Sequence, residues 1–209
     1  MIEKKGLVVF VEGDTDVEFY QALLLFLKER SPSGRYPFDV VLPPKNMRGI
    51  GSFKERAVRK FEKQVLRDNK GTRFTVVLAY DTDVFEFADK PPINWKEVEN
   101  ALKKAGAEQV IHLRARRSIE DWFLLDEAGV KRYLHISPTV CLKGATGLKR
   151  LESAFKKANR VYVKGNKVKG FVGALDIKLI AGNLCEELSP LCSVLRITCD
   201  QNGMCESRK

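Results

Sequence analysis

Short apolar runs that end at acidic residues recur along the first half of the chain and predict buried β-strands. Residues 7–11 (LVVFV) lead directly into Glu12, and residues 74–79 (FTVVLA) lead into Tyr80 and Asp81. Uninterrupted apolar runs of this length are typical of strands covered on both faces in a parallel sheet. Two further apolar runs predict strands at residues 38–42 and 109–113.

Longer stretches with apolar positions three and four residues apart separate these strands and predict helices. One helix follows Thr15, which is a candidate cap, and a second runs from the candidate cap Ser52 to about residue 68. A third helix follows the pair Pro91-Pro92 and covers about residues 95–104. The resulting βαβαβαβ order predicts an α/β fold with a mainly parallel central sheet flanked by helices.

After Arg117 the pattern becomes helical. Apolar spacing predicts helices at residues 119–125, 147–159 and 171–188, and a last strand at residues 194–198. We therefore expect a single domain over residues 1–199, with a core at about 6–125, a helical C-terminal extension at about 126–190 and a frayed polar tail at 200–209.

The composition favours a polyanionic partner. Lys and Arg number 37 against 27 Asp and Glu, which gives a formal net charge of +10 and suits nucleic acid, although a generally basic surface would give the same balance. The five cysteines form no C-x-x-C pair, which argues against a zinc site or a disulfide framework and for reduced thiols in a cytoplasmic protein. The first apolar run is too short to be a signal peptide or to cross a membrane.

Acidic residues follow the first and third predicted strands. Glu12 and Asp16 come after one strand, and Asp81 and Asp83 after the other. The carboxyl ends of parallel strands share one edge of a sheet, so these side chains can meet there. Clustered carboxylates repel unless a cation holds them, and hard oxygen ligands select Mg²⁺ or Mn²⁺. Two such ions would stabilise both the attacking and the leaving oxygen of a phosphodiester.

A third cluster, Ser118-Ile119-Glu120-Asp121, follows the fourth predicted strand at the same edge. Each cluster also has a simpler structural explanation. Glu12 and Asp16 could complement the dipole of the following helix, Asp81 and Asp83 could form an acidic turn, and Ser118 could cap a helix.

The ordered set of motifs resembles the Toprim domain, and within it the branch of the overcoming-lysogenization-defect (OLD) family nucleases. The matching segments are VVFVEG, extended as EGDTDVEFY, then VVLAYDTD, then RSIEDWFLLD, and a lysine in GALDIKLIAGNL. The resemblance covers roughly residues 7–183. It implies a Toprim-type, Rossmann-like sheet and a Mg²⁺-dependent nuclease acting on DNA or RNA, with a role in phage defence.

The resemblance also implies roles for individual residues. Glu12 would bind metal and act as a general acid or base, and Lys178 would neutralise charge in the transition state, with Lys164 as its competitor. The remaining metal ligands would be Asp16, Asp81, Asp83, Ser118 and Glu120. The chain departs from the family in having Asp16 in place of the usual Glu. It also shows no ATPase domain of the kind that many members carry, so we expect that it either acts alone or depends on a separate ATPase or defence-system partner.

Basic residues near these motifs are candidates for gripping a nucleic-acid backbone. They are Arg48 in the loop RGIGS, the run Arg114, Arg116 and Arg117, and Lys164 in the Lys- and Gly-rich segment VKGNKVKG. A solvated basic face is the alternative for each.

Two other functions stay open at this point. The segment VVLAYDTDVFE also resembles the nucleophile motif of haloacid-dehalogenase-like phosphatases, in which Asp81 would attack phosphorus. That function leaves Glu12-Gly13 and Glu120 unexplained. The third candidate is a non-catalytic subunit that binds nucleic acid or an effector. Topoisomerase and primase functions are disfavoured, since the chain offers no domain for a nucleophilic tyrosine and no zinc module.

Overall fold

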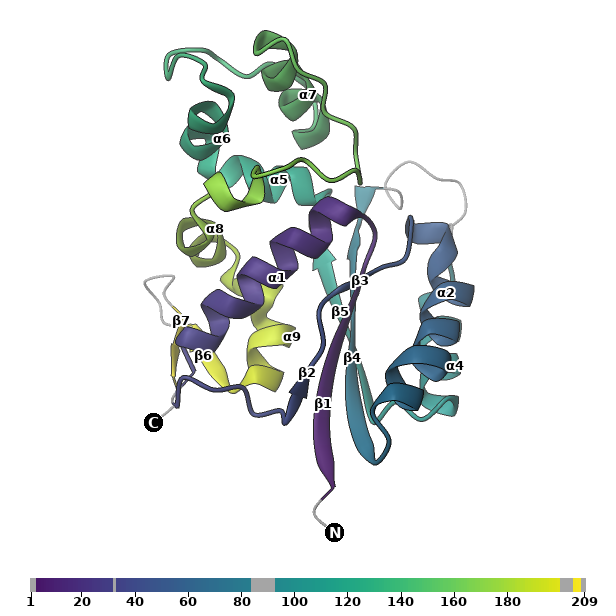
Figure 1. Cartoon of the computed structure of the whole chain (residues 1–209). Helices are drawn as coiled ribbons and strands as arrows, with labels where there is room; N and C mark the ends of the chain where they lie inside the picture. Colours follow the sequence, from purple (N-terminus) through teal and green to yellow (C-terminus); the bar gives the residue numbers. More distant parts are fainter. Residues whose placement is uncertain (1–2, 32, 84–92, 200–204, 208–209) are drawn as a thin grey trace.

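A parallel β-sheet lies at the centre of the computed structural model, which describes residues 3–31, 33–83, 93–199 and 205–207. The strand order is β2-β1-β4-β5, and β3 also pairs with β1 (Figure 1). The strands are β1 (Lys4–Val11), β2 (Val40–Val41), β3 (Lys45–Asn46), β4 (Thr72–Asp81) and β5 (Gln109–Ala115). The predicted α/β fold with a mainly parallel sheet is confirmed.

The apolar runs form strands because both faces of the sheet are covered. Side chains alternate along a strand, so Leu7, Val9 and Val11 enter one core and Val8 and Phe10 enter the other. On the first face lie α1 (Asp14–Glu29), α5 (Ile119–Phe123), α8 (Ile177–Asn183) and α9 (Cys185–Leu195), and on the second lie α2 (Phe53–Lys60), a π-helical turn (Phe61–Leu66) and α4 (Trp95–Lys104).

The register of the central strands aligns their carboxyl ends. Phe10 of β1 is paired with Leu78 of β4, and Asp81 at the end of β4 is paired with Ala115 at the end of β5. The residues that follow β1, β4 and β5 therefore emerge at one edge of the sheet, where ligands bind in open parallel sheets.

The C-terminal helices extend the first core and do not form a separate one. α6 (Glu127–Leu134) and α7 (Gly147–Lys157) contribute Val130, Leu151 and Phe155 to the same cluster as Leu7 and Val9. The long predicted helix over residues 171–188 is divided into a 3₁₀ turn (Val172–Ala174), α8 and α9.

Several predicted boundaries are corrected. The second strand is reduced to Val40–Val41, and Ser52 makes no capping hydrogen bond with its side chain, while Asn94 caps α4. The last strand, β6 (Ile197–Cys199), begins late because α9 continues to Leu195, and β7 (Cys205–Ser207), within the tail predicted to fray, pairs antiparallel with β6. Pro91 and Pro92 lie outside the described residues.

None of the helices in the described part of the chain is sufficiently long and apolar to cross a membrane.

A buried aspartate joins two of the C-terminal helices. The carboxylate of Asp126 accepts hydrogen bonds from Gly129 N at the start of α6 (2.8 Å) and from Asp176 N at the start of α8 (2.8 Å). Replacing Asp126 by Ala would leave both N–H groups without this acceptor, so we expect Asp126→Ala to lower the free energy of unfolding by about 2–3 kcal/mol in urea denaturation. Asp68→Ala, which removes an exposed ion pair with Arg67, should cost less than about 0.5 kcal/mol. Equal costs for the two variants would contradict this role of Asp126.

Candidate functional site

The turn between β1 and α1 sets the first part of the site. Gly13 is the N-cap of α1, and its N–H donates to Asp16 Oδ2 at 3.0 Å. This bond turns the carboxylate of Asp16 back toward the end of β1, where Glu12 lies. Thr15, predicted as the cap, lies inside the helix, and its hydroxyl instead donates to the carbonyl of Asn166.

A loop from far along the chain closes over this turn. Asp14 N donates to the carbonyl oxygen of Gly165 at 2.7 Å, and a Cβ on Gly13 would lie 2.5 Å from Gly165 Cα. Position 13 therefore requires glycine because two backbones meet there. Together with the bond from Thr15 to Asn166, this contact fixes the segment that carries Lys164 against the start of α1.

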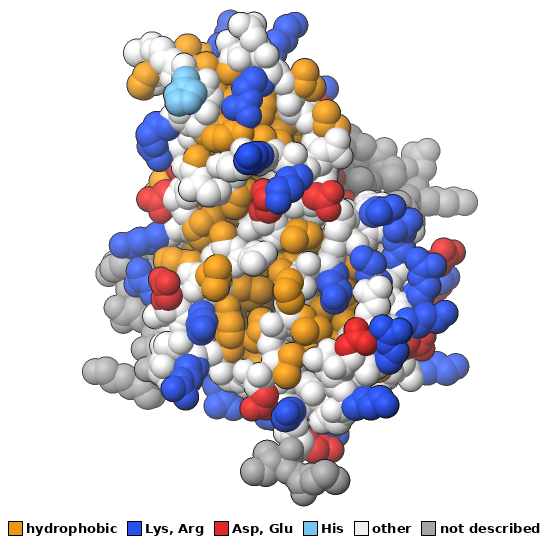
Figure 2. All heavy atoms as spheres, in the orientation of Figure 1, with side chains coloured by type: hydrophobic (Ala, Val, Ile, Leu, Met, Phe, Trp, Pro, Cys, Tyr) orange, Lys and Arg blue, Asp and Glu red, His pale blue; other side chains and the backbone are white. Residues whose placement is uncertain are grey.

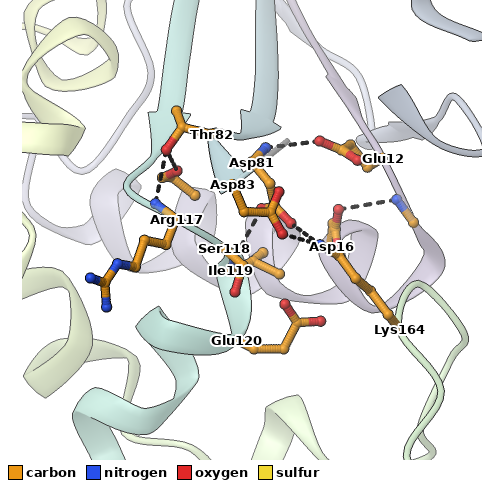
Figure 3. Close-up of polar contacts among 12 residues, drawn as sticks. Glu12, Asp16, Asp81, Thr82, Asp83, Arg117, Ser118, Ile119, Glu120 and Lys164 are labelled. Carbon is orange, nitrogen blue, oxygen red and sulfur yellow. Dashed lines mark hydrogen bonds and ion pairs between the residues drawn. The ribbon is translucent and has the colours of Figure 1, made fainter. Parts of the chain in front are cut away.

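Lys164 lies between the two aspartates that follow β4 (Figure 3). Its Nζ is 2.8 Å from Asp81 Oδ2 and 3.1 Å from Asp83 Oδ2. Burial acts to lower the pKa of Lys164, but the neighbouring carboxylates, Asp81 first, outweigh it and raise this pKa above its ordinary value. Lys164 therefore stays charged and neutralises part of the negative charge of the site.

Asp81 connects the ends of three strands. Its backbone N–H donates to Glu12 Oε1 at 2.8 Å, and its Oδ1 accepts from Ile119 N, just after β5, at 2.9 Å. Asp81 is only 4% exposed. Burial raises the pKa of Asp81 well above its usual range, while Lys164 acts in the opposite direction. The residue thus holds Glu12 and the start of α5 at fixed positions around itself.

The backbone after β4 is tied to the turn after β5. Thr82 N and Asp83 N both donate to the carbonyl of Arg117, at 2.9 and 2.8 Å, and Arg117 N donates to Thr82 Oγ1 at 2.8 Å. Arg117 has a left-handed backbone with φ of 65°. These bonds fix the direction in which Asp83 leaves the strand.

Glu120 completes the acidic cluster from the first turn of α5. It is fully buried, and its Oε1 accepts a hydrogen bond from the hydroxyl of Tyr162 at 3.0 Å. Among the described residues, Glu120 Oε2 and Asp83 Oδ1 are buried without a hydrogen-bond partner. Buried carboxylate oxygens are normally satisfied, so these two mark a place where an additional positive group would be stabilised.

Burial, together with the excess negative charge of the cluster, also raises the pKa values of two of its carboxyl groups, Glu12 and Asp16. Burial, followed by the repulsion from Asp16, raises the pKa of Glu12 to about 7 despite the hydrogen bond from Asp81. Burial and the charge of Glu120 raise the pKa of Asp16 to about 6. One ammonium group therefore does not compensate for this set of carboxylates.

A pocket of about 690 Å³ lies at the carboxyl edge of the sheet, and Asp83 and Glu120 are not among its lining residues. Glu12, Asp16, Asp81 and Lys164 line one side of it. The loop after β3, which includes Arg48, lines another part.

The structure brings together most of the residues predicted for the site. Contacts and mutual electrostatic effects connect Glu12, Asp16, Asp81, Asp83, Glu120 and Lys164. Ser118 is an exception: it is the N-cap of α5, and its hydroxyl donates to Asp121 Oδ2 at 3.0 Å.

Lys178, whose role in neutralising transition-state charge stays a prediction, lies outside the pocket. Lys178 is exposed in the first turn of α8 and does not line the pocket, because this helix packs inward through Ile180 and Ala181. Lys164, its competitor in the sequence, makes the ion pairs with Asp81 and Asp83.

The predicted nucleic-acid-binding arginines lie at different places. Arg48 lines the main pocket, whereas Arg116 and Arg117 line a second pocket of about 390 Å³ beside Trp122. Arg114 is exposed, and its Nε donates to the hydroxyl of Tyr80 at 3.1 Å.

Three residues that contribute to the site were not predicted. Asn46 lines the pocket and donates to Asp14 Oδ1, Tyr162 donates to Glu120, and Gly165 accepts from Asp14. The alternation in VYVK, with Tyr162 and Lys164 inward and Val161 exposed, was a usable signal for an extended segment with one buried face.

The donor set suits a hard divalent cation. The candidate ligands are carboxylate oxygens, which Mg²⁺ and Mn²⁺ prefer, and two of these oxygens have no partner in the described structure. In the present arrangement, no three Asp, Glu, His or Cys side chains within the described ranges converge closely enough to hold a metal ion. The ammonium of Lys164 instead lies between Asp81 and Asp83. The residues fit a cation by chemistry and charge, and binding would require Lys164 or the carboxylates to move.

No protein-family model matches the chain, and neither the curated proteins nor the solved structures contain a significant match to it.

The raised pKa of Glu12 makes a stability prediction for the metal-free protein. A carboxyl whose pKa rises from 4.5 unfolded to about 7 folded loses stabilisation as pH rises through that interval, by up to about 3 kcal/mol. Glutamine does not titrate and retains an oxygen that can accept from Asp81 N. We therefore compare the free energies of unfolding of Glu12→Gln and wild type in EDTA. The difference between them should shift in favour of Glu12→Gln by about 2–3 kcal/mol when the pH is raised from 4 to 8.

Urea denaturation across this pH range measures the effect. Glu55→Gln, which alters an exposed carboxylate on α2, is the control and should follow wild type within about 0.5 kcal/mol at every pH. If Glu12→Gln also followed wild type, the carboxyl of Glu12 would not be destabilised by its surroundings.

Proposed function

We propose that this protein is a divalent-cation-dependent nuclease that hydrolyses phosphodiester bonds of DNA or RNA at the carboxyl edge of its sheet. The observation that carries the proposal is the convergence of acidic side chains from the ends of β1, β4 and β5 around one lysine. Glu12, Asp81 and Glu120 come from these three ends, and Lys164 comes from the loop that covers them.

Glu12, Asp81 and Asp83 would hold one cation, and Asp16 and Glu120 would contribute to a second. When bound, such cations polarise the phosphate and stabilise the charges of the attacking and leaving oxygens. The two buried carboxylate oxygens without partners, on Asp83 and Glu120, support this assignment.

The chain's own groups would perform the remaining work. Lys164 brings a positive charge beside Asp81, and after moving aside for a cation its ammonium group would stabilise the additional negative charge that develops on the phosphoryl oxygens in the transition state. Glu12 is half-buried at the pocket wall, and its second oxygen, Oε2, would accept the proton of a water molecule or return one to the leaving oxygen. Arg48 at the pocket mouth would orient the substrate phosphate.

The resemblance to the Toprim domain of OLD-family nucleases supports the same function independently of the pocket. Its motifs supply Glu12, Asp81, Asp83 and Glu120 in the expected order. The net charge of +10 suits a polyanionic substrate. A role in phage defence and a separate ATPase partner belong to this proposal as implications of the resemblance, and a cytoplasmic location belongs to it as an inference from the cysteine pattern.

One alternative is weakened by the contacts of Asp81. A haloacid-dehalogenase-like phosphatase would need this carboxylate as a free nucleophile. Here Oδ1 accepts a backbone hydrogen bond from Ile119 and Oδ2 is paired with Lys164. A carboxylate with both oxygens engaged and 4% exposure is poorly placed to attack phosphorus.

A second candidate function has a specific observation in its favour. The ion pairs of Lys164 with both Asp81 and Asp83 would also stabilise a non-catalytic subunit, in which the lysine permanently takes the place of a cation. Such a protein would bind nucleic acid without cutting it.

Cleavage assays distinguish the two functions. Labelled plasmid, single-stranded DNA and RNA are incubated with Mg²⁺, Mn²⁺ or EDTA. We expect metal-dependent cleavage by wild type, a loss of at least about 100-fold in Glu12→Gln and Asp81→Asn, and a loss of about 100-fold in Lys164→Ala.

Lys178→Ala is the matched control because it removes an exposed lysine outside the pocket, and it should retain activity within about twofold. Binding of nucleic acid without cleavage under any of these conditions would favour the non-catalytic subunit. Cleavage that persists in Asp81→Asn would contradict the proposed site.

A further inference from the structure

Basic side chains gather on the outer face of α2 and on the loop that precedes this helix. Figure 2 shows Lys and Arg side chains along the right-hand edge of the molecule, where Figure 1 places α2. We call this surface the α2 basic face; its members are Lys45, Arg48, Arg56, Arg59 and Lys60.

Glu55 and Glu62 are the acids nearest to these cations along the chain. None of the five forms an ion pair with a carboxylate within the described ranges, although lysines elsewhere do so, as Lys103 with Glu99 and Lys149 with Glu152. Lys60 shows the effect of this crowding. Its pKa is lowered first by burial and then by repulsion from the other four members. A surface that concentrates like charges at a cost to its own stability suits an anionic partner.

The α2 basic face is continuous with the pocket. Arg48 belongs to both, and Lys60 Nζ donates to the carbonyl of Asn46, another pocket residue, at 2.9 Å. The loop between them is attached to the acidic cluster, since Gly49 N donates to the carbonyl of Glu12 at 2.9 Å. A polyanion that lies along α2 would therefore reach the pocket at Arg48, beside the loop that is bonded to Glu12.

The spacing of the basic residues suits successive phosphates. Arg56 and Arg59 are three residues apart on the helix, and Lys60 is four residues from Arg56, so their side chains lie on one face about 5–6 Å apart at Cβ. Arginine forms paired hydrogen bonds with phosphate oxygens and is only weakly hydrated, which favours it for backbone contacts.

We infer that the α2 basic face binds the phosphate backbone of the nucleic-acid strand whose scissile bond enters the pocket. The inference rests on the proposed function and adds the side from which the substrate approaches. The charge of the backbone would be bound, independently of base sequence, by Lys45, Arg56, Arg59 and Lys60. Arg48 would contact the backbone where it enters the pocket that holds Glu12 and Lys164.

Binding in EDTA tests this surface separately from cleavage. Labelled duplex DNA, single-stranded DNA and RNA are titrated with the full chain carrying Arg56→Ala and Arg59→Ala, over about 50–200 mM salt. The matched control carries Lys104→Ala and Lys156→Ala, which removes the same charge from exposed positions on α4 and α7. Circular dichroism and urea denaturation verify that both proteins are folded.

We expect the Arg56/Arg59 variant to bind at least tenfold more weakly than the control for at least one of the three nucleic acids. Its plot of log K against log salt should be shallower by about 1.5–2, since two phosphate contacts are lost. Equal affinity and equal slope in the two variants would overturn the inference, and so would an absence of nucleic-acid binding by wild type.

Cleavage results bear on the proposed function alone. If wild type binds nucleic acid through Arg56 and Arg59 but never cuts it, the inference about the α2 basic face stands and the proposed nuclease function is contradicted. If wild type cuts nucleic acid and the Arg56/Arg59 variant binds it as well as the control does, the nuclease function stands and the inference about the α2 basic face is contradicted.

Discussion

The ion pairs of Lys164 with Asp81 and Asp83 are the interaction on which the arrangement of the site depends. Parallel strands bring the acidic residues after β1, β4 and β5 to one edge, where they are largely removed from water and repel one another. A single ammonium group offsets part of this repulsion. The rest remains in the raised pKa values of Glu12 and Asp16 and in the unpaired oxygens of Asp83 and Glu120.

The segment that carries Lys164 is held both by the packing of Tyr162 in the core and by polar contacts with the acidic cluster and the start of α1. Tyr162 donates to Glu120, and in the turn that follows it Gly165 accepts from Asp14 N and Asn166 accepts from Thr15, so this segment touches both the acidic cluster and the start of α1. A Cβ on Gly13 would lie 2.5 Å from Gly165 Cα, so the turn and the loop pack directly against each other. The backbone contacts thereby position Lys164. The ammonium group at the end of its side chain can still move when a ligand binds beside Asp81.

Much of the fold and the acidic part of the site could be predicted from the sequence, because both depend on local patterns. The apolar run before Glu12 and the one before Asp81 predict buried parallel strands, and their ends must share an edge. The lysine could not be assigned in this way. Lys164 lies in the Lys- and Gly-rich segment VKGNKVKG and Lys178 in the mostly apolar segment GALDIKLIAGNL, and only the long-range contacts of the first segment with Gly13, Asp81 and Asp83 show which lysine meets the acidic cluster. The cap of α1 was also missed. Gly13 is the N-cap, and the hydroxyl of Thr15 bonds instead to the carbonyl of Asn166, 151 residues away in the sequence.

Titration calorimetry of Mn²⁺ into the metal-free protein tests the central claim, that the acidic cluster is incompletely neutralised by Lys164 and accepts a divalent cation. The account predicts saturable binding to wild type, its loss in Asp81→Asn, and tighter binding in Lys164→Ala, where the competing ammonium has been removed. No saturable binding to a folded wild-type protein, or unchanged binding in Asp81→Asn, would contradict it.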